Sequence, residues 1–249
     1  MSLVVAAAQS ASVAGDIPRN VARHLQFAAV AAERGVQLLI FPELSLTGYE
    51  LGVVRSHALR ADSSVLDPLR ELAARAQITI VVGAPLLNNK DELHIAAFAL
   101  RPDGPVLTYT KEHVHQSEQP VFTSGPGGPM LHVADRTVAL AICADATHPQ
   151  HAAKAAARGA NVYAVGVMID EDGYVRKAAL LSNYAREHGM AVLMANYSGV
   201  TGGCLSAGRS AIWSEDGRLV TSSVGTEETL VVAERNGAWN GSTLPISLP

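Results

Sequence analysis

The chain has 249 residues, of which 48% are hydrophobic and 17% charged, and its formal net charge is −4. A chain of this length and apolar content can bury a sizeable core, and the low share of charged residues excludes an intrinsically disordered protein. The mild negative balance, without any basic cluster, excludes the electrostatic pattern of a nucleic-acid-binding or membrane-surface protein.

Cysteine usage and the N-terminal residues indicate a compartment. Cys143 and Cys204 are the two cysteines, a count that suits a reducing environment better than a disulfide scaffold. Residues 1–5 lack the basic start of a signal peptide, and no apolar run approaches the length of a membrane span. We therefore expect a cytoplasmic protein. Because no linker or composition shift marks a boundary, we also expect a single domain over residues 1–249.

Four helices are predicted along the chain. The first begins at Asp16, with Pro18 in its first turn, and runs to about Arg34. A second begins at Ser63 or Ser64 and ends near Gln77, and two more span 148–158 and 172–188. Three of these helices end with a cation and then a glycine, at 34–35, 158–159 and 188–189. That ending complements the helix dipole and supplies a left-handed cap.

Strand-like segments alternate with these helices. An apolar run follows the end of each predicted helix, at 36–41, 78–82, 160–165 and 191–195. Two hairpins are also predicted, one from 93–100 and 105–110 and the other from 210–214 and 218–223, each joined by a turn that ends in glycine. The pattern predicts an α/β protein with a mixed sheet and helices outside it.

Cys143 and Glu43 each follow a buried strand and are candidates for chemistry. Cys143 lies where the apolar run 138–142 gives way to a helical pattern, a place where the helix dipole favours a thiolate. Glu43 follows 38–42, and an apolar setting there would raise its pKa towards that of a general base. The alternatives are a buried structural cysteine and a solvated loop glutamate.

Lys111 ends the strand 106–110 in the same way. It can stabilise a developing oxyanion or favour the thiolate of a nearby cysteine, and the alternative is a surface lysine at a strand end. Glu118 is a weaker candidate without further context. Four histidines, at 113, 115, 148 and 151, offer metal ligands, but their spacing matches no zinc signature, so we expect no metal. Serine-hydrolase, phosphate-loop and dinucleotide motifs are absent from the sequence.

These junctions, in this order, resemble the carbon–nitrogen hydrolase (nitrilase) superfamily. Residues 39–49, ending in Leu-Thr-Gly-Tyr, resemble its glutamate motif, and Tyr109 to Val114 is similar to its lysine motif. Glu118, shortly before Phe122, resembles a second glutamate, and Val138 to Pro149 resembles the cysteine motif. Late segments around Asn196 and 208–217 are similar as well, so the resemblance covers nearly the whole chain.

The resemblance implies a fold, a mechanism and an assembly. The fold is a four-layer αββα sandwich, and Cys143 attacks an amide-like carbon after Glu43 takes its proton. Lys111 and the backbone N–H of Ala144 stabilise the oxyanion, Glu118 positions Lys111 or the substrate, and no cofactor is required. Members commonly form homodimers through the helix after the cysteine motif, here 151–158, and the C-terminal tail, here 236–249.

The substrate is expected to be a small amide or N-carbamoyl compound. Asp145 favours the amidase and carbamoylase branches over nitrile hydrolysis, which remains the alternative together with a catalytically silent scaffold protein. The chain departs from the family pattern at Ala144, at His148 to Gln150 and at Tyr184, which affects the shape of the pocket. The residues expected to bind the substrate are Tyr49, His113, Ala144, Asp145, His148 and Met168. Asp145 or Asp170 either meets a cationic substrate tail or accepts hydrogen bonds from backbone amides.

Overall fold

Two β-sheets form the centre of the protein. The computed structural model describes residues 2–246. The first sheet has the strand order β15-β14-β1-β2-β3-β4-β5, and the second has the order β13-β12-β9-β8-β7-β6. The strands of the first sheet are β1 (Leu3–Gln9), β2 (Leu38–Ile40), β3 (Thr79–Leu87), β4 (Leu93–Leu100), β5 (Leu107–Thr110), β14 (Thr229–Asn236) and β15 (Ala238–Pro245). Those of the second are β6 (Leu131–Val133), β7 (Arg136–Ile142), β8 (Val162–Gly166), β9 (Ala191–Ala195), β12 (Ala211–Trp213) and β13 (Leu219–Ser222).

Both sheets are mixed, as the sequence predicted. Strands β1, β2 and β3 are parallel to one another, and so are β7, β8 and β9. The remaining pairs are antiparallel and include both predicted hairpins, β4–β5 and β12–β13. A further small hairpin joins β10 (Val200–Thr201) to β11 (Cys204–Leu205).

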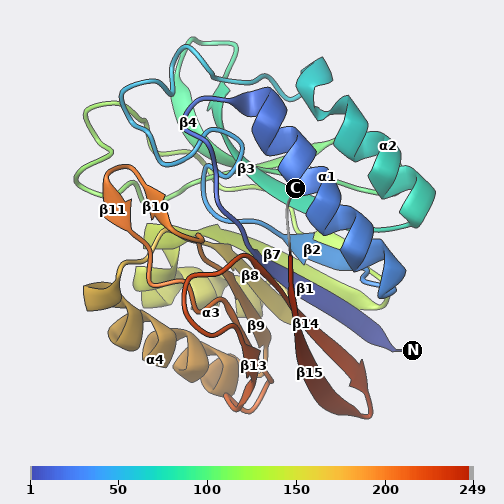
Figure 1. Cartoon of the computed structure of the whole chain (residues 1–249). Coiled ribbons are helices and arrows are strands. Elements are labelled where there is room, and N and C mark those ends of the chain that lie inside the picture. The colour runs from blue at the N-terminus through green and yellow to red at the C-terminus, as the bar shows by residue number, and fades with distance from the viewer. Residues whose placement is uncertain (1, 247–249) are drawn as a thin grey trace.

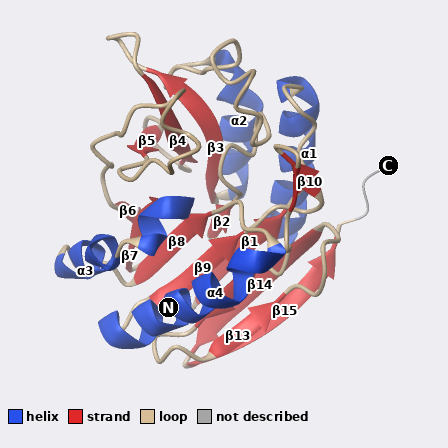
Figure 2. Cartoon of the chain, turned by 90° about the vertical axis from the view of Figure 1, so that its left-hand side faces the viewer, coloured by secondary structure: helices blue, strands red, loops and turns tan. Residues whose placement is uncertain are grey.

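Helices cover the outer face of each sheet. Helices α1 (Ile17–Glu33) and α2 (Asp67–Ala76) lie over the first sheet, and α3 (Pro149–Ala157) and α4 (Glu171–His188) lie over the second (Figures 1 and 2). Two short 3₁₀ helices, η1 (Ser64–Leu66) and η2 (Cys143–Thr147), precede α2 and α3. The layers therefore run helix, sheet, sheet, helix, which confirms the predicted four-layer αββα sandwich.

Three apolar cores separate these four layers. The central core lies between the sheets and contains Val5 and Ile40 from the first sheet and Leu140 and Leu193 from the second. A second core lies under α1 and α2, and a third lies under α3 and α4. Strands such as β3 and β9 are buried along nearly their whole length, because both faces of each sheet are covered.

Local signals in the sequence placed most helix ends correctly. Asp16 caps α1 through its side chain, and Gln77 ends α2 in the left-handed conformation. Helix α4 begins slightly earlier than predicted, because Asp170 rather than Asp172 is the N-cap and accepts the N–H of Gly173. The C-terminal tail is extended: residues 238–245 form strand β15, which pairs with β14 of the same chain, and residues 247–249 of the predicted tail lie outside the described residues.

Two glycines allow the sheets to close around the segment that follows β2. A Cβ atom at Gly83 of β3 would lie 2.6 Å from the carbonyl oxygen of Pro42, and a Cβ at Gly166 of β8 would lie 2.6 Å from that of Phe41. Both separations are shorter than any normal contact, so only glycine fits. The segment carrying Glu43 therefore passes between the sheets with backbone on both sides.

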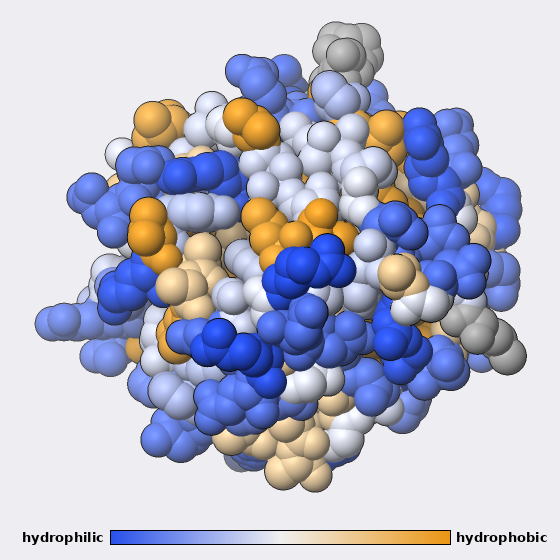
Figure 3. Space-filling view, turned by 90° about the horizontal axis from the view of Figure 1, so that it is seen from below, coloured by the Kyte–Doolittle hydropathy of each residue, from blue (hydrophilic) through white to orange (hydrophobic). Residues whose placement is uncertain are grey.

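The face of the molecule seen from below (Figure 3) is mainly polar. The face seen in Figure 3 is dominated by hydrophilic residues, with apolar residues in small groups between them. Within the described residues, no helix has both the length and the apolar character needed to cross a membrane.

Candidate active site

Three strand ends bring the predicted acid, cation and thiol together. Glu43 follows β2, Lys111 follows β5, and Cys143 follows β7 as the first residue of η2. Strands β2 and β5 belong to the first sheet and β7 to the second, so the cluster forms where the two sheets face each other. The carboxyl ends of strands are where α/β proteins place reactive groups, because the chain leaves the sheet there.

Lys111 is the centre of a buried ionic cluster. Its side chain is fully buried, and Nζ lies 2.6 Å from Oε1 of Glu43 and 2.8 and 2.7 Å from the two carboxylate oxygens of Glu118. Burial alone would lower the pKa of Lys111, but the attraction of Glu43, Cys143 and Glu118 raises it. Lys111 is therefore a permanent cation beside the thiol.

Glu118 is held in place by neighbours from two directions. The hydroxyl of Tyr49 donates to its Oε1 at 2.7 Å, and the N–H of His115 donates to its Oε2 at 2.7 Å. Tyr49 is itself fixed, because its N–H donates to Oγ1 of Thr201 on the β10–β11 hairpin. This arrangement aims both carboxylate oxygens of Glu118 at Lys111.

Glu43 has the properties of a general base. Burial raises its pKa to about 7, although the Lys111 cation acts in the opposite direction, and the charge of Glu118 adds to the rise. Its Oε1 is bound by Lys111, and the thiol of Cys143 also acts on the carboxylate as a hydrogen-bond donor. A buried carboxylate with a raised pKa beside a thiol is placed to accept the thiol proton.

Cys143 occupies a strained backbone position. Its φ angle is +41°, in the left-handed region that residues with side chains rarely adopt. The half-buried thiol points at the carbonyl oxygen of Met168, with Sγ 3.6 Å away. A strained turn between a strand and a helix presents its side chain at the edge of the sheet, where an attacking nucleophile can reach its substrate.

The thiol is protonated at rest, which corrects one expectation. Burial and the nearby Glu43 carboxylate raise the pKa of Cys143 to about 12, and the cations Lys111 and Lys177 offset this only in part. The helix dipole stabilises a thiolate at Cys143 only weakly, because η2 is a 3₁₀ helix of five residues. A base must therefore remove the thiol proton before the sulfur can attack.

Asp145 accepts hydrogen bonds from backbone amides, which is the second of its two predicted roles. Its carboxylate is fully buried and accepts hydrogen bonds from the N–H of Ile142, the N–H and Nδ1 of His113, and the hydroxyl of Tyr109. No oxygen remains free for a cationic substrate tail. Asp170 is likewise occupied as the cap of α4.

The other expected pocket residues are spread over the entrance and the interior. His113 is partly exposed and stacks on the exposed His148, with ring centroids 3.9 Å apart. Tyr49 and Met168 are half-buried, and both contact the cluster directly, through Glu118 and Cys143. Ala144 is buried.

Two of the departures from the expected motif lie away from this cluster. Gln150 is exposed on α3, and Tyr184 is buried in the third core, where its hydroxyl has no partner.

Several residues that shape the site had no role assigned to them from the sequence, although Asn196 belongs to a late segment that resembles the family. The hydroxyl of Tyr197 donates to the backbone oxygen of Glu43 at 2.6 Å, which fixes the glutamate from the opposite sheet. Asn196 holds the segment after β8 by bonding both the N–H and the oxygen of Ile169. Lys177, on α4, adds a second cation that acts on the thiol. Only spatial proximity reveals these roles, because the partners lie far apart along the chain.

The four histidines do not gather around a metal position. His113 binds Asp145 and stacks on His148, His115 bonds Ser117, and His151 bonds two tyrosines. Across residues 2–246, no group of three or more histidine, cysteine, aspartate or glutamate side chains is arranged to hold a metal ion.

Comparison with known proteins identifies the class of this fold and site. The sequence profile described as carbon–nitrogen hydrolase matches residues 4–239, and the chain belongs to that family. It is an enzyme of the amidase-like branch of the nitrilase superfamily.

Particular relatives make the similarity concrete. The amidase from Nesterenkonia sp. AN1 is 28% identical in a structure that shows Michael addition of acrylamide at its active-site cysteine; the match covers 92% of each chain, with a TM-score of 0.84. A complex of the same amidase with butyramide is 27% identical over 94% of this chain and 90% of that one, with a TM-score of 0.85.

Two curated relatives extend the comparison. An (R)-stereoselective amidase from Pseudomonas sp. is 26% identical, covering 83% of this chain and 75% of its own length. The glutamine-dependent NAD(+) synthetase of Thermotoga maritima is 24% identical over 93% of this chain, but this chain spans only 42% of the synthetase.

Proposed function

We propose that this enzyme hydrolyses a small amide or N-carbamoyl compound through an acyl-thioester on Cys143. The observation that carries the proposal is the carboxylate of Glu43, which is buried against Lys111 and lies beside a thiol that holds its proton. The carboxylate has a pKa of about 7 and the thiol about 12, so transfer to Glu43 occurs as sulfur attacks rather than before it.

The first half of the reaction forms the thioester. Glu43 takes the thiol proton while Sγ of Cys143 bonds to the carbonyl carbon. The resulting oxyanion is stabilised by Lys111 and by the N–H of Ala144, which lies in the first turn of η2 and has no carbonyl partner within that helix. Glu43 then returns the proton to the nitrogen as the C–N bond breaks, and ammonia or an amine leaves.

The second half releases the acid. Glu43 takes a proton from water, whose oxygen attacks the thioester carbon, and the C–S bond breaks as the thiol regains its proton. Glu118 keeps Lys111 in position throughout, because it contributes two of the three hydrogen bonds to Nζ. The protein residues supply every proton transfer in this scheme, and no cofactor enters it.

Tyr49, His113, His148 and Met168 are the residues we propose to contact substrate. Tyr49 lies in the loop after Glu43, His113 in the loop after Lys111, His148 between η2 and α3, and Met168 in the segment before α4. Ala144 contributes its N–H. We assign Asp145 a positioning role, since protein donors occupy its carboxylate.

The test is ammonia release from a panel of primary amides, ω-amides of dicarboxylic acids, N-carbamoyl amines and nitriles. Cys143→Ala is assayed alongside, and Cys204→Ser serves as the matched control because Cys204 is exposed on β11. We expect turnover of an amide or carbamoyl compound that vanishes in Cys143→Ala and persists in Cys204→Ser. Turnover that survives Cys143→Ala would refute the mechanism, and turnover of nitriles alone would refute the substrate class.

We also propose that the chain forms a homodimer or higher homo-oligomer in the cytoplasm. Val175 on α4 is 72% exposed, which is unusual for a large apolar side chain. The alanines of α3 are a poorer candidate surface, because Ala152 and Ala155 pack into the third core. Light scattering should give at least twice the chain mass, and a monomeric mass would refute the assembly. Both cysteines are free thiols, as a reducing compartment requires.

A further inference from the structure

A chain of buried hydrogen bonds extends from the nucleophile towards the outer helix α3. Asp145 accepts from the hydroxyl of Tyr109 at 2.7 Å, and that hydroxyl lies 2.8 Å from Nε2 of His151. Nδ1 of His151 lies 2.8 Å from the hydroxyl of Tyr163. All four side chains are buried, and none of them takes part in the proposed proton transfers.

The direction of each hydrogen bond follows from the first one. Because the Tyr109 proton goes to the Asp145 carboxylate, the Tyr109 oxygen is an acceptor, and Nε2 of His151 must carry the hydrogen. Nδ1 is then the acceptor for the hydroxyl of Tyr163. Every member is satisfied when His151 is the neutral imidazole with its proton on Nε2, and in no other state.

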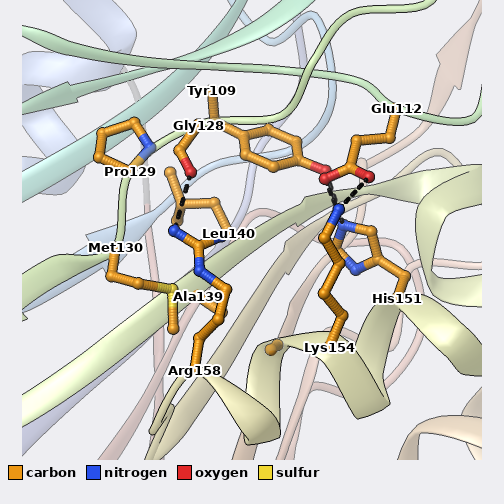
Figure 4. Close-up of a pocket in the computed structure, with 11 residues that line it drawn as sticks. Tyr109, Glu112, Gly128, Pro129, Met130, Ala139, Leu140, His151, Lys154 and Arg158 are labelled. Carbon is orange, nitrogen blue, oxygen red and sulfur yellow. Dashed lines mark hydrogen bonds and ion pairs between the residues drawn. The ribbon is translucent and has the colours of Figure 1, made fainter.

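The surroundings of His151 favour this neutral state. Burial lowers its pKa, although Asp145 and Glu112 act in the opposite direction. Glu112 approaches Nε2 at 3.8 Å but is engaged by Nζ of Lys154 at 3.2 Å, as Figure 4 shows at the edge of a small cavity. The other facing groups are His113, whose charge also lowers the pKa of His151, and Tyr163 on β8.

The near end of the chain reaches both halves of the active site. Asp145 binds the N–H of Ile142, the residue before the strained Cys143, and the N–H of His113, two residues after Lys111. Its carboxylate therefore joins the turn that carries the thiol to the loop that carries the lysine. A carboxylate free to rotate would release both.

We propose that His151, as the neutral Nε2–H imidazole, is a positioning residue for Cys143 and acts through Tyr109 and Asp145. It fixes the Tyr109 hydroxyl, which fixes the carboxylate, which holds the nucleophile's turn against the lysine loop. The proposal rests on the role proposed for Cys143. It concerns the placement of the thiol and not the identity of the substrate.

The test measures alkylation of Cys143 by iodoacetamide in a Cys204→Ser background, so that one thiol is followed and no amide substrate is needed. His151→Leu should lower the rate constant by about tenfold or more, because small displacements of a reacting group are costly. His151→Gln should restore most of it, since an amide can donate to Tyr109 and accept from Tyr163. Gln150→Leu, at an exposed position of the same helix, is the matched control and should leave the rate unchanged.

Circular dichroism of each variant separates positioning from unfolding. A folded His151→Leu that reacts at the wild-type rate would overturn the proposal, and so would a His151→Gln that reacts as slowly as His151→Leu. If His151→Leu fails to fold, the rates of His151→Gln and Tyr109→Phe decide instead. Should the amide panel show no turnover while these alkylation results hold, the proposed function fails and the positioning role stands.

Two further measurements examine the route and the tautomer. In a Tyr109→Phe background, His151→Leu should cause no additional loss, because the connection is already cut; losses that multiply would show a route that bypasses Tyr109. In ¹⁵N-histidine spectra at pH 7, the signals that disappear in His151→Gln should be those of a neutral ring protonated on Nε2. An imidazolium or an Nδ1–H tautomer would contradict the deduced hydrogen-bond directions.

Discussion

Glu118→Gln should shift the acid limb of the activity profile to lower pH. Glu118 and Glu43 bind the same ammonium, with Nζ–O distances of 2.7 and 2.6 Å, so their oxygens lie no more than about 5 Å apart. Two charges at this distance repel by about 3 kcal/mol at an effective dielectric constant of about 20. That repulsion is one cause of the raised pKa of Glu43.

Removing the charge of Glu118 therefore lowers the pKa of Glu43 from about 7. The full repulsion would change the pKa of Glu43 by about two units. Because both carboxylates bind the Lys111 cation, which offsets part of their repulsion, the expected change is about one unit or slightly more. The ionised carboxylate is the active form, so activity falls as the pH drops through this pKa. With a lower pKa the fall occurs at a lower pH. The absolute rate should drop as well, because Lys111 loses its charge-assisted partner.

The assay is the pH dependence of kcat/KM on a substrate from the amide panel, which reports groups of the free enzyme. Glu71→Gln is the matched control, since Glu71 is exposed on α2, far from the thiol in the fold, and its limb should coincide with that of the wild type. A limb that stays in place in Glu118→Gln, or that moves to higher pH, would refute the electrostatic coupling of the two carboxylates.

Three other substitutions follow from the same geometry. In Asp145→Asn, the new NH₂ group faces N–H or O–H groups of Ile142, His113 or Tyr109 that also donate. The free energy of unfolding measured in urea should therefore fall by about 2–4 kcal/mol. A variant as stable as the wild type would contradict the buried network. Gly83→Ala drives a Cβ into the backbone beside Glu43 and should lower kcat at least about tenfold, whereas Gly52→Ala meets nothing within 4 Å and serves as its control; equal rates in both would show that the contact is not tight. Glu43→Gln should gain stability over the wild type as the pH rises from 4.5 to about 7, because the folded wild type holds the Glu43 proton longer than the unfolded chain does. The gain is about 3 kcal/mol at most, and a pH-independent difference would show that the pKa of Glu43 is not raised.

Local patterns in the sequence were sufficient for the four helices, the two hairpins and the three reactive positions, but not for strands such as β1, β6 and β14. The cap at Asp16, the left-handed end after α4 and the turn glycines are short-range signals, and each appears in the structure where it was read. Glu43, Lys111 and Cys143 stand directly after strands, which is why their convergence was predictable: strands in a layered α/β fold deliver their ends to common edges.

Charge states followed from the sequence only in part. The raised pKa of Glu43 was expected from its apolar flanks, and the resemblance implied a thiol that gives its proton to Glu43, whereas the strand-to-helix position of Cys143 favoured a thiolate. Burial penalises any lone charge, so the state of Cys143 depends on whether desolvation and Glu43 outweigh the cations around it. That balance depends on distances between the two sheets, which no local pattern contains.

The sequence by itself determined the four helices, the two hairpins and the strand ends that carry Glu43, Lys111 and Cys143, and the resemblance of those strand ends to a known family implied the four-layer sandwich. Only the tertiary structure decided the rest: that Asp145 is consumed by the backbone, that Tyr197 fixes Glu43 from the opposite sheet, and that His151 reaches the nucleophile through Tyr109. The physical reason is the separation along the chain over which each kind of interaction acts. Capping and periodicity act over a few residues, whereas the bonds of Asp145 to His113, of His151 to Tyr109 and of Tyr197 to Glu43 join positions 32 to 154 residues apart, and their partners become neighbours only when the sheets pack.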